Sequence, residues 1–416
     1  MRGIVRGMKR IVLPACLALA AAACAAGPPE PGPLGVVEVG PGGFIEVRSV
    51  SNLGGESPGA SYRAAALAID DYGPIKGRAV ALVGMHDLCE PGGGHASSQT
   101  IAADARVVGV IGTQCSVTAV EAIPAISEAG MVMISPTNTA PALTSDLQGN
   151  RGSRQLPGYY RTAHNDLITG RVVAEFAYRE LGLRRMAAIH DGDPYTSGLA
   201  MAFEEAFHGL GGEVVAVGVV SKDAADAAAA VAEVAAGDPD GIFFPLFLEA
   251  GAAVAQEIAA TASLAGATLI SADGVLEAEF LQLPESEGLY IASPNLDFSG
   301  NTNAATNESA DQLLAAYEQE YGEPPATSYW AHAYDAATLL LTAIEQVAVE
   351  VGDTLVIDRA ALRRALSETA GFGGLTGALS CDAFGDCGSG GIQIVHHTDI
   401  AVTDITQLPV VYRGSR

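Results

Sequence analysis

Two polar residues stand where the pattern of the chain places the start of a helix and the end of a strand. Ser116 follows Cys115 and opens a predicted helix at residues 117–129. A helix start exposes free N–H groups and partial positive charge, which suit a small anion, although a serine there is also an ordinary N-cap. Asp273 follows a predicted strand at residues 267–271 and can pair with a cation, or it can form an exposed Asp-Gly turn.

A catalytic serine is the best enzymatic alternative. Residues 55–59 read Gly-Glu-Ser-Pro-Gly, which satisfies the G-x-S-x-G pattern of the α/β-hydrolase nucleophile elbow. That elbow needs a sharp strand-to-helix turn at the serine, whereas a loop at residues 51–56 intervenes here. Pro58 at the start of a predicted helix makes Ser57 a natural cap instead. A serine hydrolase remains the less favoured alternative, and we expect no catalytic residues.

Metal and cofactor motifs are weak. His396 and His397 lack partners at a useful spacing, and an exposed strand end explains them better. The glycines at residues 371–374 follow a predicted helix rather than a strand, so they do not form a dinucleotide-binding loop, and no P-loop signature occurs. We therefore expect no metal and no cofactor.

The first 23 residues read as an export signal. Four basic residues precede a short apolar run at residues 11–23, which is too short to span a bilayer. Ala21-Ala22-Ala23-Cys24 resembles a bacterial lipobox, with alanine where leucine is usual, so we expect Cys24 to carry lipid. Ordinary secretion with cleavage nearby is the alternative. Residues 24–43 begin with a Pro- and Gly-rich stretch and are expected to form a tether.

Charge and cysteine content agree with export. The formal net charge is −26, and the four positive charges of the signal leave −30 on the remainder. Such a surface repels phosphate backbones, so nucleic acid is a poor candidate partner. Cys89, Cys115, Cys381 and Cys387 remain after the signal, and an even number in an exported chain suggests disulfides. Of three possible pairings, Cys89 with Cys115 and Cys381 with Cys387 is the simplest.

The body of the chain alternates strands with helices. Predicted strands lie at residues 44–50, 79–85, 107–111, 131–135, 186–190, 213–220, 241–247 and 267–271. Predicted helices lie at residues 57–71, 95–106, 117–129, 166–181, 197–209, 224–236 and 249–264, with later ones near 309–321, 329–349 and 358–369. Continuous apolar strands fit a parallel sheet that is buried on both faces. The sequence therefore predicts an α/β fold with two doubly wound units in tandem.

An ordered series of segments resembles the type I periplasmic binding proteins of branched-chain amino acid ABC transporters, which are leucine/isoleucine/valine-binding proteins. The segments are AIDD at 68–71, the Cys89 to Cys115 pair, VIGTQCS at 110–116, MISPTNTAPALT at 133–144, YYRTAHND at 159–166, IHDGDPYTSGLA at 189–200, SADGV at 271–275, AYDAATLLLTAIE at 333–345 and GLTGALSCDAFGD at 374–386. Each segment alone is weak, but their joint order spans nearly the whole mature chain.

The resemblance implies two Rossmann-like lobes joined by three crossovers, with the ligand in the cleft between them. The N-terminal lobe would comprise residues 44–161 and 290–375. The C-terminal lobe would comprise residues 162–289 and 376–416. The family's N-lobe disulfide matches Cys89–Cys115, whereas Cys381–Cys387 is additional and would staple a hairpin in the tail.

The resemblance also assigns roles in the cleft. Ser116 matches the family's carboxylate-binding serine, and Thr139 aligns with the family's ligand-binding threonine. Thr137, Asn138 and Thr139 form a loop that, by this resemblance, gives backbone and hydroxyl groups to the ligand. Asp273 stands where relatives often carry the glutamate that pairs with the ammonium. The further residues that we expect in the cleft are Tyr195, Leu246 and Phe247. At residues 242–249 this chain departs from the family's tyrosine and glycine pattern, so Leu246 or Phe247 would make the wall more apolar.

The leading hypothesis is a non-enzymatic binding lipoprotein in the cell envelope, in the periplasm or on the outer face of the cytoplasmic membrane. It would bind an apolar amino acid, or a related small carboxylate or amide, and deliver it to an ABC permease. A ligand sensor that regulates a signalling partner is the second hypothesis, because the same fold serves both roles.

Overall fold

The computed structural model describes residues 32–51, 59–389 and 391–414, which belong to one unit, Pro31–Arg416. The expected signal segment, Cys24 and Ser57 lie outside the described residues. Within the described part of the chain, no helix combines the length and the apolar character needed to cross a membrane.

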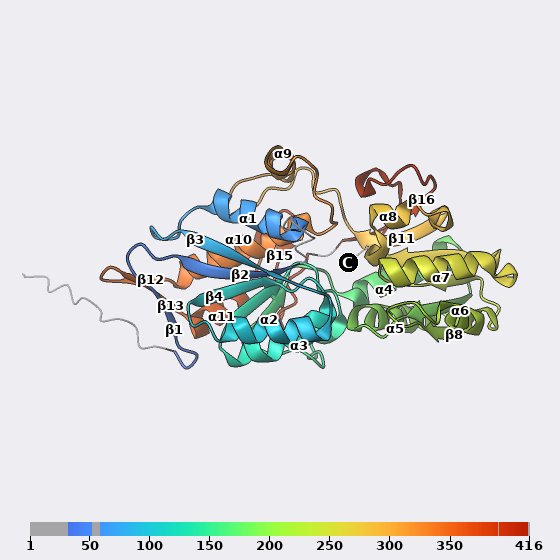
Figure 1. Ribbon diagram of the computed structural model, residues 1–416, viewed down its shortest axis with the longest axis horizontal. Coiled ribbons are helices and arrows are strands. Elements are labelled where there is room, and N and C mark those ends of the chain that lie inside the picture. Colours follow the sequence, from blue (N-terminus) through green and yellow to red (C-terminus); the bar gives the residue numbers. More distant parts are fainter. Residues whose placement is uncertain (1–31, 52–58, 390, 415–416) are drawn as a thin grey trace, which may run out of the picture. The chain divides into compact units, whose positions relative to one another are not determined.

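Five parallel strands form the first sheet, in the order β3-β2-β4-β5-β6 (Figure 1). The strands are β2 (Ile45–Ser51), β3 (Val80–His86), β4 (Val107–Gly112), β5 (Val132–Ser135) and β6 (Tyr159–Arg161). The helices around them are α1 (Ala60–Tyr72), α2 (Pro91–Ala102), α3 (Ser116–Glu128), α10 (Trp330–Val347) and α11 (Arg359–Ser367). Helices α1 and α10 pack together on one face of the sheet, and α2 and α3 pack together on the other. Every residue of β4 is buried, as a strand covered on both faces requires.

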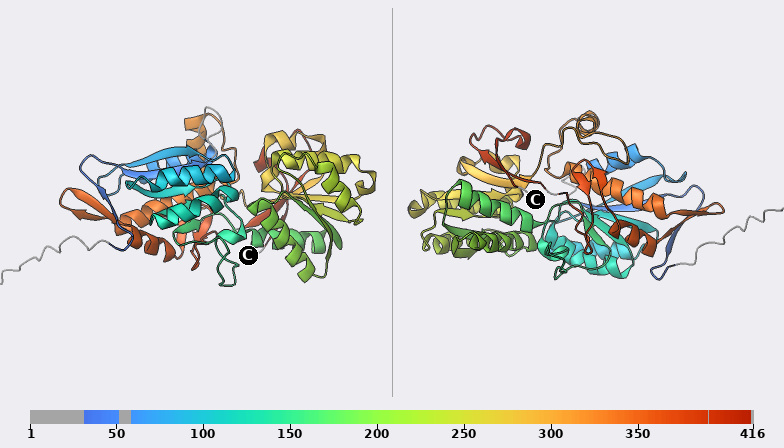
Figure 2. Two further views of the ribbon diagram at one scale, coloured as in Figure 1. Left: turned by 60° about the horizontal axis from the view of Figure 1, so that its bottom comes forward. Right: turned by 180° about the vertical axis from the view of Figure 1, so that it is seen from behind.

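The second sheet has seven strands in the order β17-β16-β11-β10-β9-β7-β8. Its parallel strands are β7 (Arg185–His190), β8 (Glu213–Val219), β9 (Gly241–Phe243), β10 (Thr268–Ala272) and β11 (Leu289–Pro294). Strand β16 (Ile392–His397) pairs antiparallel with β11, and β17 (Val410–Arg413) pairs antiparallel with β16 at the edge of the sheet. Helices α4 (Asp166–Glu175) and α5 (Pro194–Gly209) cover one face, and α6 (Ala227–Ala235) and α7 (Leu248–Ala260) cover the other (Figure 2). One π-helical turn, η2 (Phe176–Glu180), extends α4.

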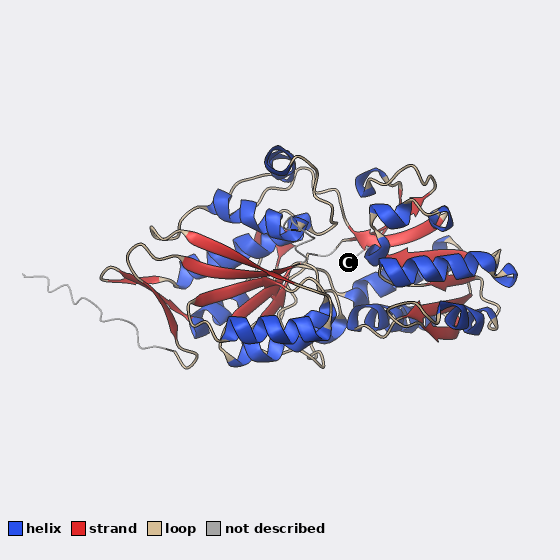
Figure 3. Cartoon of the chain, in the orientation of Figure 1, coloured by secondary structure: helices blue, strands red, loops and turns tan. Residues whose placement is uncertain are grey.

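We call the first sheet with its helices the first lobe, and the second sheet with its helices the second lobe. Both have the doubly wound α/β architecture that the alternating pattern predicts, so this prediction is confirmed (Figure 3).

Smaller elements complete the fold. Strands β1 (Val36–Val39), β12 (Val349–Val351) and β13 (Thr354–Asp358) form a three-stranded sheet, and β14 (Phe372–Gly374) pairs with β15 (Gly377–Leu379). Helix α9 (Ala310–Tyr321) begins with a capping box between Ser309 and Gln312. The remaining short helices are η1 (Pro141–Leu143), η3 (Ala262–Leu264), η4 (Asp273–Val275), α8 (Ala278–Leu281), η5 (Pro284–Ser286) and η6 (Ile405–Gln407).

The structure shortens the expected tether. Residues 24–43 were expected not to pack, yet β1 pairs antiparallel with β13 and buries Val37 and Val39. Alternating apolar residues in VVEV suit a strand with one buried face, and this signal follows the Pro- and Gly-rich stretch directly.

Two lobe boundaries also differ from those expected from the sequence. The first lobe was expected to resume at residue 290, but β11 lies in the second sheet between β10 and β16, so the chain leaves that sheet only after Pro294. The second lobe was expected to resume at residue 376. Instead, the Thr376 amide and hydroxyl donate to Asp335 of α10, at 2.9 and 2.8 Å, which keeps the β14-β15 hairpin with the first lobe.

Both disulfides of the simplest pairing are present. Cys89 bonds to Cys115, and Cys381 bonds to Cys387. The second bond does not staple a tail hairpin, because it closes the loop between β15 and β16.

Candidate functional site

A half-buried carboxylate at the end of β10 joins the two lobes. Asp273 begins η4, and its carboxylate accepts hydrogen bonds from the Tyr195 hydroxyl at 2.9 Å and the Tyr329 hydroxyl at 2.5 Å. Tyr195 lies in the first turn of α5, whose N-cap Asp193 accepts from the Tyr195 amide. Tyr329 directly precedes α10 of the first lobe. The structure thus brings together Tyr195 and Asp273, both expected in the cleft, and adds Tyr329.

A second carboxylate lies in the same region. Asp166 is the first residue of α4 and is 1% exposed, and neither of its carboxylate oxygens accepts a hydrogen bond. His164 Nε2 lies 3.9 Å from Asp166 Oδ1. The His164 ring stacks on Tyr329 with 6.1 Å between centroids, and His332 lies 5.3 Å from the same tyrosine ring. We call Asp166, Asp273, His164, Tyr195, Tyr329 and His332 the acidic cluster.

Burial sets the charges in the acidic cluster. It raises the pKa of Asp273, while the hydroxyls of Tyr329 and Tyr195 oppose this shift. Burial raises the pKa of Asp166 to about 8, and the nearby charge of Asp273 adds to this shift. Burial also lowers the pKa of His332 to about 3 and that of His164 well below its usual range, so both imidazoles are neutral at neutral pH.

The acidic cluster has no cationic partner of its own. Among the residues that the structure describes, no lysine or arginine forms an ion pair with Asp166 or Asp273. Buried carboxylates without a counter-charge are costly, so this arrangement can bind a cationic group from outside the chain.

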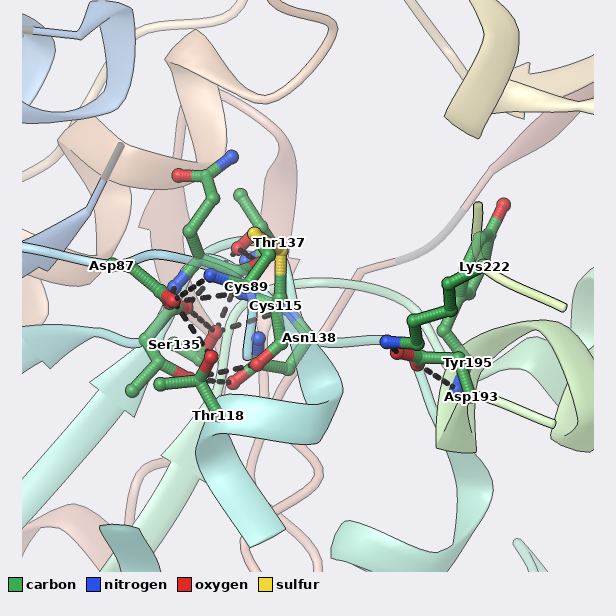
Figure 4. The surroundings of a disulfide bond; sticks show 12 residues. Asp87, Cys89, Cys115, Thr118, Ser135, Thr137, Asn138, Asp193, Tyr195 and Lys222 are labelled. Atoms are coloured by element: carbon green, nitrogen blue, oxygen red, sulfur yellow. Dashed lines mark hydrogen bonds and ion pairs between the residues drawn. A yellow bond between two sulfur atoms is a disulfide. The ribbon is translucent and has the colours of Figure 1, made fainter. Parts of the chain in front are cut away.

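The start of α3 is partly occupied by the protein itself. Asp87 follows β3, and its carboxylate accepts from the backbone amides of Gln114 at 2.7 Å and Cys115 at 3.1 Å, and from the Thr118 hydroxyl at 2.6 Å (Figure 4). Ser116 is buried, and its hydroxyl accepts only a long bond of 3.4 Å from the Ala140 amide. Part of the expected anion site at this helix start is therefore filled by Asp87, while the Ser116 hydroxyl faces the loop after β5.

The loop after β5 has mainly structural contacts. The Thr137 hydroxyl donates to the Gln114 carbonyl at 2.6 Å, and Asn138 Oδ1 accepts from the hydroxyls of Thr113 and Tyr159, both at 3.1 Å. The Thr139 carbonyl accepts from the Asp166 amide at 3.0 Å, and the Thr139 hydroxyl opposes the pKa rise of Asp166. Of the three predicted loop residues, Thr139 is the one that contacts the acidic cluster.

A buried ion pair positions Asp166 and Thr139. Arg161 is fully buried, and its guanidinium donates to Asp386 at 3.1 and 2.6 Å and to the Ala140 carbonyl at 2.9 Å. Asn165 Nδ2 also donates to Asp386, at 3.0 Å. These contacts fix the segments on either side of the acidic cluster to the loop that the Cys381–Cys387 disulfide closes.

Phe247 rather than Leu246 lies beside Tyr195. The Phe247 ring lies 5.2 Å from the Tyr195 ring. Leu246 is fully buried and packs into the core around α6 and α7, so its expected place in the cleft is wrong. After β9 the chain turns into α7, and this turn directs Leu246 inward and leaves Phe247 on the other side.

Sequence reasoning missed Asp87, Asp166 and Tyr329 as residues of the site region. Asp87 stands two residues before a predicted disulfide cysteine, and Asp166 ends one of the family-like segments, so both could have been noticed. No local pattern marks Tyr329, because its role depends on a contact with Asp273, far away in sequence.

Metal binding finds little support in the described part of the chain. Asp87, Cys89 and Cys115 are close enough to hold an ion, but both sulfurs are in a disulfide. His397 is buried beside Ser286, and His396 stacks on Tyr290.

Comparisons with known proteins agree on one family. A family model described as periplasmic binding protein matches residues 49–386. An amino acid binding protein of Pseudomonas aeruginosa is 30% identical over 199 residues, which cover 47% of this chain and about half (51%) of that protein. A Leu/Ile/Val-binding protein homolog of Brucella melitensis is 26% identical over 331 residues, covering 80% and 83% of the two chains. Among solved structures, a leucine binding protein of Thermotoga maritima shares the fold with a TM-score of 0.72 at 21% identity, over 89% of this chain and 99% of the other.

Proposed function

Because the chain belongs to the periplasmic binding protein family, we propose that it is an extracytoplasmic binding protein for an amino-acid-like ligand. It delivers this ligand to an ABC permease in the membrane and performs no catalysis. The names of the relatives support this class of ligand, since they are described as amino acid or Leu/Ile/Val-binding proteins.

The observation that carries the proposal is the environment of Asp273. Its carboxylate is half-buried, lies at the junction of the lobes and has two hydroxyl donors, and no lysine or arginine among the described residues pairs with it. A ligand ammonium supplies both the missing charge and further N–H donors. Tyrosine rings beside it add attraction between the cation and their faces.

The remaining parts of an amino acid have candidate contacts nearby. Phe247 and the Tyr195 ring offer an apolar wall for a side chain. Ser116 and Thr139 offer hydroxyls for a carboxylate, with Asn138 Nδ2 as a buried donor that has no partner. Leucine, isoleucine, valine and phenylalanine are therefore the first ligands to test.

Anchoring follows from the same proposal. Cys24 carries lipid and holds the protein at the cell envelope, where the ligand arrives from outside. Mass spectrometry of the membrane fraction tests this part, since Cys24→Ser should release the protein without lipid.

A calorimetric screen against amino acids, their amides and small carboxylates tests the binding function. A ligand at 100 times its Kd should raise the free energy of unfolding by roughly 2.7 kcal/mol. Asp273→Asn should weaken amine-bearing ligands by about 100-fold, because it leaves the ammonium without its charged partner. Glu213→Gln, which changes an exposed carboxylate in the same lobe, serves as the control. Tight binding only of acids that lack an amine would overturn the amino-acid assignment.

A further inference from the structure

The described residues contain ten buried side-chain nitrogen or oxygen atoms without a hydrogen-bond partner, and these fall into two groups. Four are guanidinium nitrogens of arginines outside the acidic cluster. The other six all lie in or next to the acidic cluster: Asn138 Nδ2, His164 Nδ1, Asp166 Oδ1, Asp166 Oδ2, Thr169 Oγ1 and His332 Nδ1. Native proteins pair most buried polar atoms, so such a concentration indicates a place that a ligand completes.

Asp166 has no structural task that explains its burial. The N-cap of α4 is Asn165, whose side-chain oxygen accepts from the Leu167 amide at 3.1 Å. The backbone amide of Asp166 donates to the Thr139 carbonyl. No donor lies within hydrogen-bonding distance of either carboxylate oxygen, and the nearby hydroxyls of Thr139 and Thr169 favour the charged form only from farther away.

Asp273 and Asp166 differ in what they can still accept. Each oxygen of Asp273 already accepts one tyrosine hydroxyl. An ammonium group has three N–H donors and needs acceptors for all of them. The two oxygens of Asp166, together with the remaining lone pairs of Asp273, offer enough acceptors for three donors. The two carboxylates are linked in space, because His164 lies 3.9 Å from Asp166 and stacks on Tyr329, whose hydroxyl donates to Asp273.

We propose that Asp166 is a second carboxylate partner of the ligand's ammonium, and that binding releases the proton which Asp166 holds when the site is empty. This inference rests on the proposed amino-acid-binding function. The exchange is balanced: the Asp166 O–H bond breaks, its proton goes to solvent, and the carboxylate binds the ammonium, which keeps all its protons.

The groups around Asp166 decide where the proton resides. Those that face it from the surrounding elements are Arg161, His164, Asp273, Thr139, Thr169, Tyr195, Tyr329 and His332. Arg161 lowers the pKa of Asp166, but its guanidinium is bonded to Asp386. His164 is the only basic group within 4 Å of the Asp166 carboxylate among the described residues, and burial depresses its pKa. The proton therefore stays on Asp166, whose own pKa is about 8.

Calorimetry with the full chain tests this linkage without any mutation. Titration with L-leucine at pH 6.5, in buffers of different ionisation enthalpy, should show about one proton released per leucine bound. Affinity should rise about tenfold per pH unit between pH 6 and 7 and level off above pH 8. Two matched probes complete the set: 3-methylbutylamine lacks the carboxylate and should release the proton, whereas 4-methylpentanoate lacks the amine and should not.

A variant separates this role from a merely structural one. Asp166→Asn should bind leucine without proton release, and its loss of affinity should grow from a few-fold at pH 6 to about 100-fold at pH 8.5. Glu175→Gln, at the other end of α4, should change neither quantity. Leucine binding with no proton release, or with equal affinity in Asp166→Asn at pH 8.5, would overturn this inference alone. If neither leucine nor any other amino acid binds the wild-type chain, the proposed function and this inference both fail.

Discussion

Asp87 and Asp166 are both buried beside the start of a helix, yet their surroundings are opposite. The Asp87 carboxylate accepts from three backbone amides and one hydroxyl, whereas the Asp166 carboxylate accepts from none. Asp87 completes the fold around the Cys89–Cys115 disulfide, and Asp166 is left for something outside the chain. The comparison teaches that hydrogen-bond partners, rather than burial or residue type, distinguish a structural acid from a ligand-binding one.

Removing the satisfied acid should have the largest effect. Asp87→Ala leaves the amides of Gln114 and Cys115 and the Thr118 hydroxyl without their acceptor, so the free energy of unfolding should fall by about 4 kcal/mol. Denaturant unfolding monitored by circular dichroism measures this loss. A loss below about 1 kcal/mol would show that Asp87 is not needed for the fold. The contrast between Asp87 as a structural acid and Asp166 as a ligand-binding acid would then fail.

Removing the carboxylate of Asp166, which accepts no hydrogen bond, should raise the free energy of unfolding rather than lower it. Asp166 holds its proton to about pH 8 when folded and releases it near pH 4 when unfolded, so the native state binds more protons between these values. The wild-type protein should therefore lose stability as pH rises from 4 to 8. Asp166→Asn removes this cost, so the variant should match the wild type near pH 4 and exceed it by about 3 kcal/mol at pH 6, with the difference growing further towards pH 8. Unfolding curves across this pH range check the sign, and a variant less stable than the wild type at pH 8 would contradict it.

Asp273 differs from Asp166 because it accepts hydrogen bonds from two tyrosine hydroxyls. Tyr329→Phe removes one of the two hydroxyl bonds to Asp273 and should lower the free energy of unfolding by about 1.5 kcal/mol. It should also raise the pKa of Asp273, because the hydroxyl favours the charged form. Tyr195→Phe is the matched variant within the second lobe. If either variant changed the pKa of Asp166 and left the pKa of Asp273 unchanged, the assignment of these hydroxyl bonds to Asp273 would be contradicted.

The smallest effect is expected at the rim of the site. Lys222 Nζ lies 2.7 Å from Asp193, and its side chain is half exposed. Asp193 itself is buried, but the half-exposed ammonium of Lys222 is screened by solvent, so Lys222→Ala should lower the free energy of unfolding by about 1 kcal/mol or less. Thermal unfolding at low and high salt measures the difference, and a change above 2 kcal/mol would show that this pair is also part of the buried network.

Apolar periodicity made most of the fold predictable. Most strands and helices of both lobes lie near their expected ranges, because the apolar runs in β4 and β5 and the caps Ser309 and Asp358 are local signals. Helix α2 begins four residues earlier than expected, and strand β9 ends at Phe243 rather than at residue 247. Strand β11 was assigned to the wrong lobe because local sequence does not reveal which sheet a strand joins. That choice depends on its pairing with β10 and β16.

The positions of site residues could be predicted where those residues stand shortly after the end of a predicted strand. Asp273 and Tyr195 were expected together and lie together. Phe247 could not be chosen over Leu246 from sequence, because one residue of register reverses the direction of the side chain. Asp166 was overlooked because Asn-Asp before an apolar run resembles an ordinary helix start, and its lack of partners arises only from three-dimensional packing.

Strand β1 decides where a force on the N-terminal segment enters the fold. The Gly32 amide donates to Asp358 at 2.6 Å, and β1 pairs with β13 directly before α11, so a pull on the N-terminal segment is transmitted to the first lobe. Val37 and Val39 are buried in the same core as α1 and α10, so packing as well as backbone pairing resists such a pull. If Cys24 carries lipid as proposed, the anchor therefore loads the first lobe directly and the second lobe only through the segments that join the two.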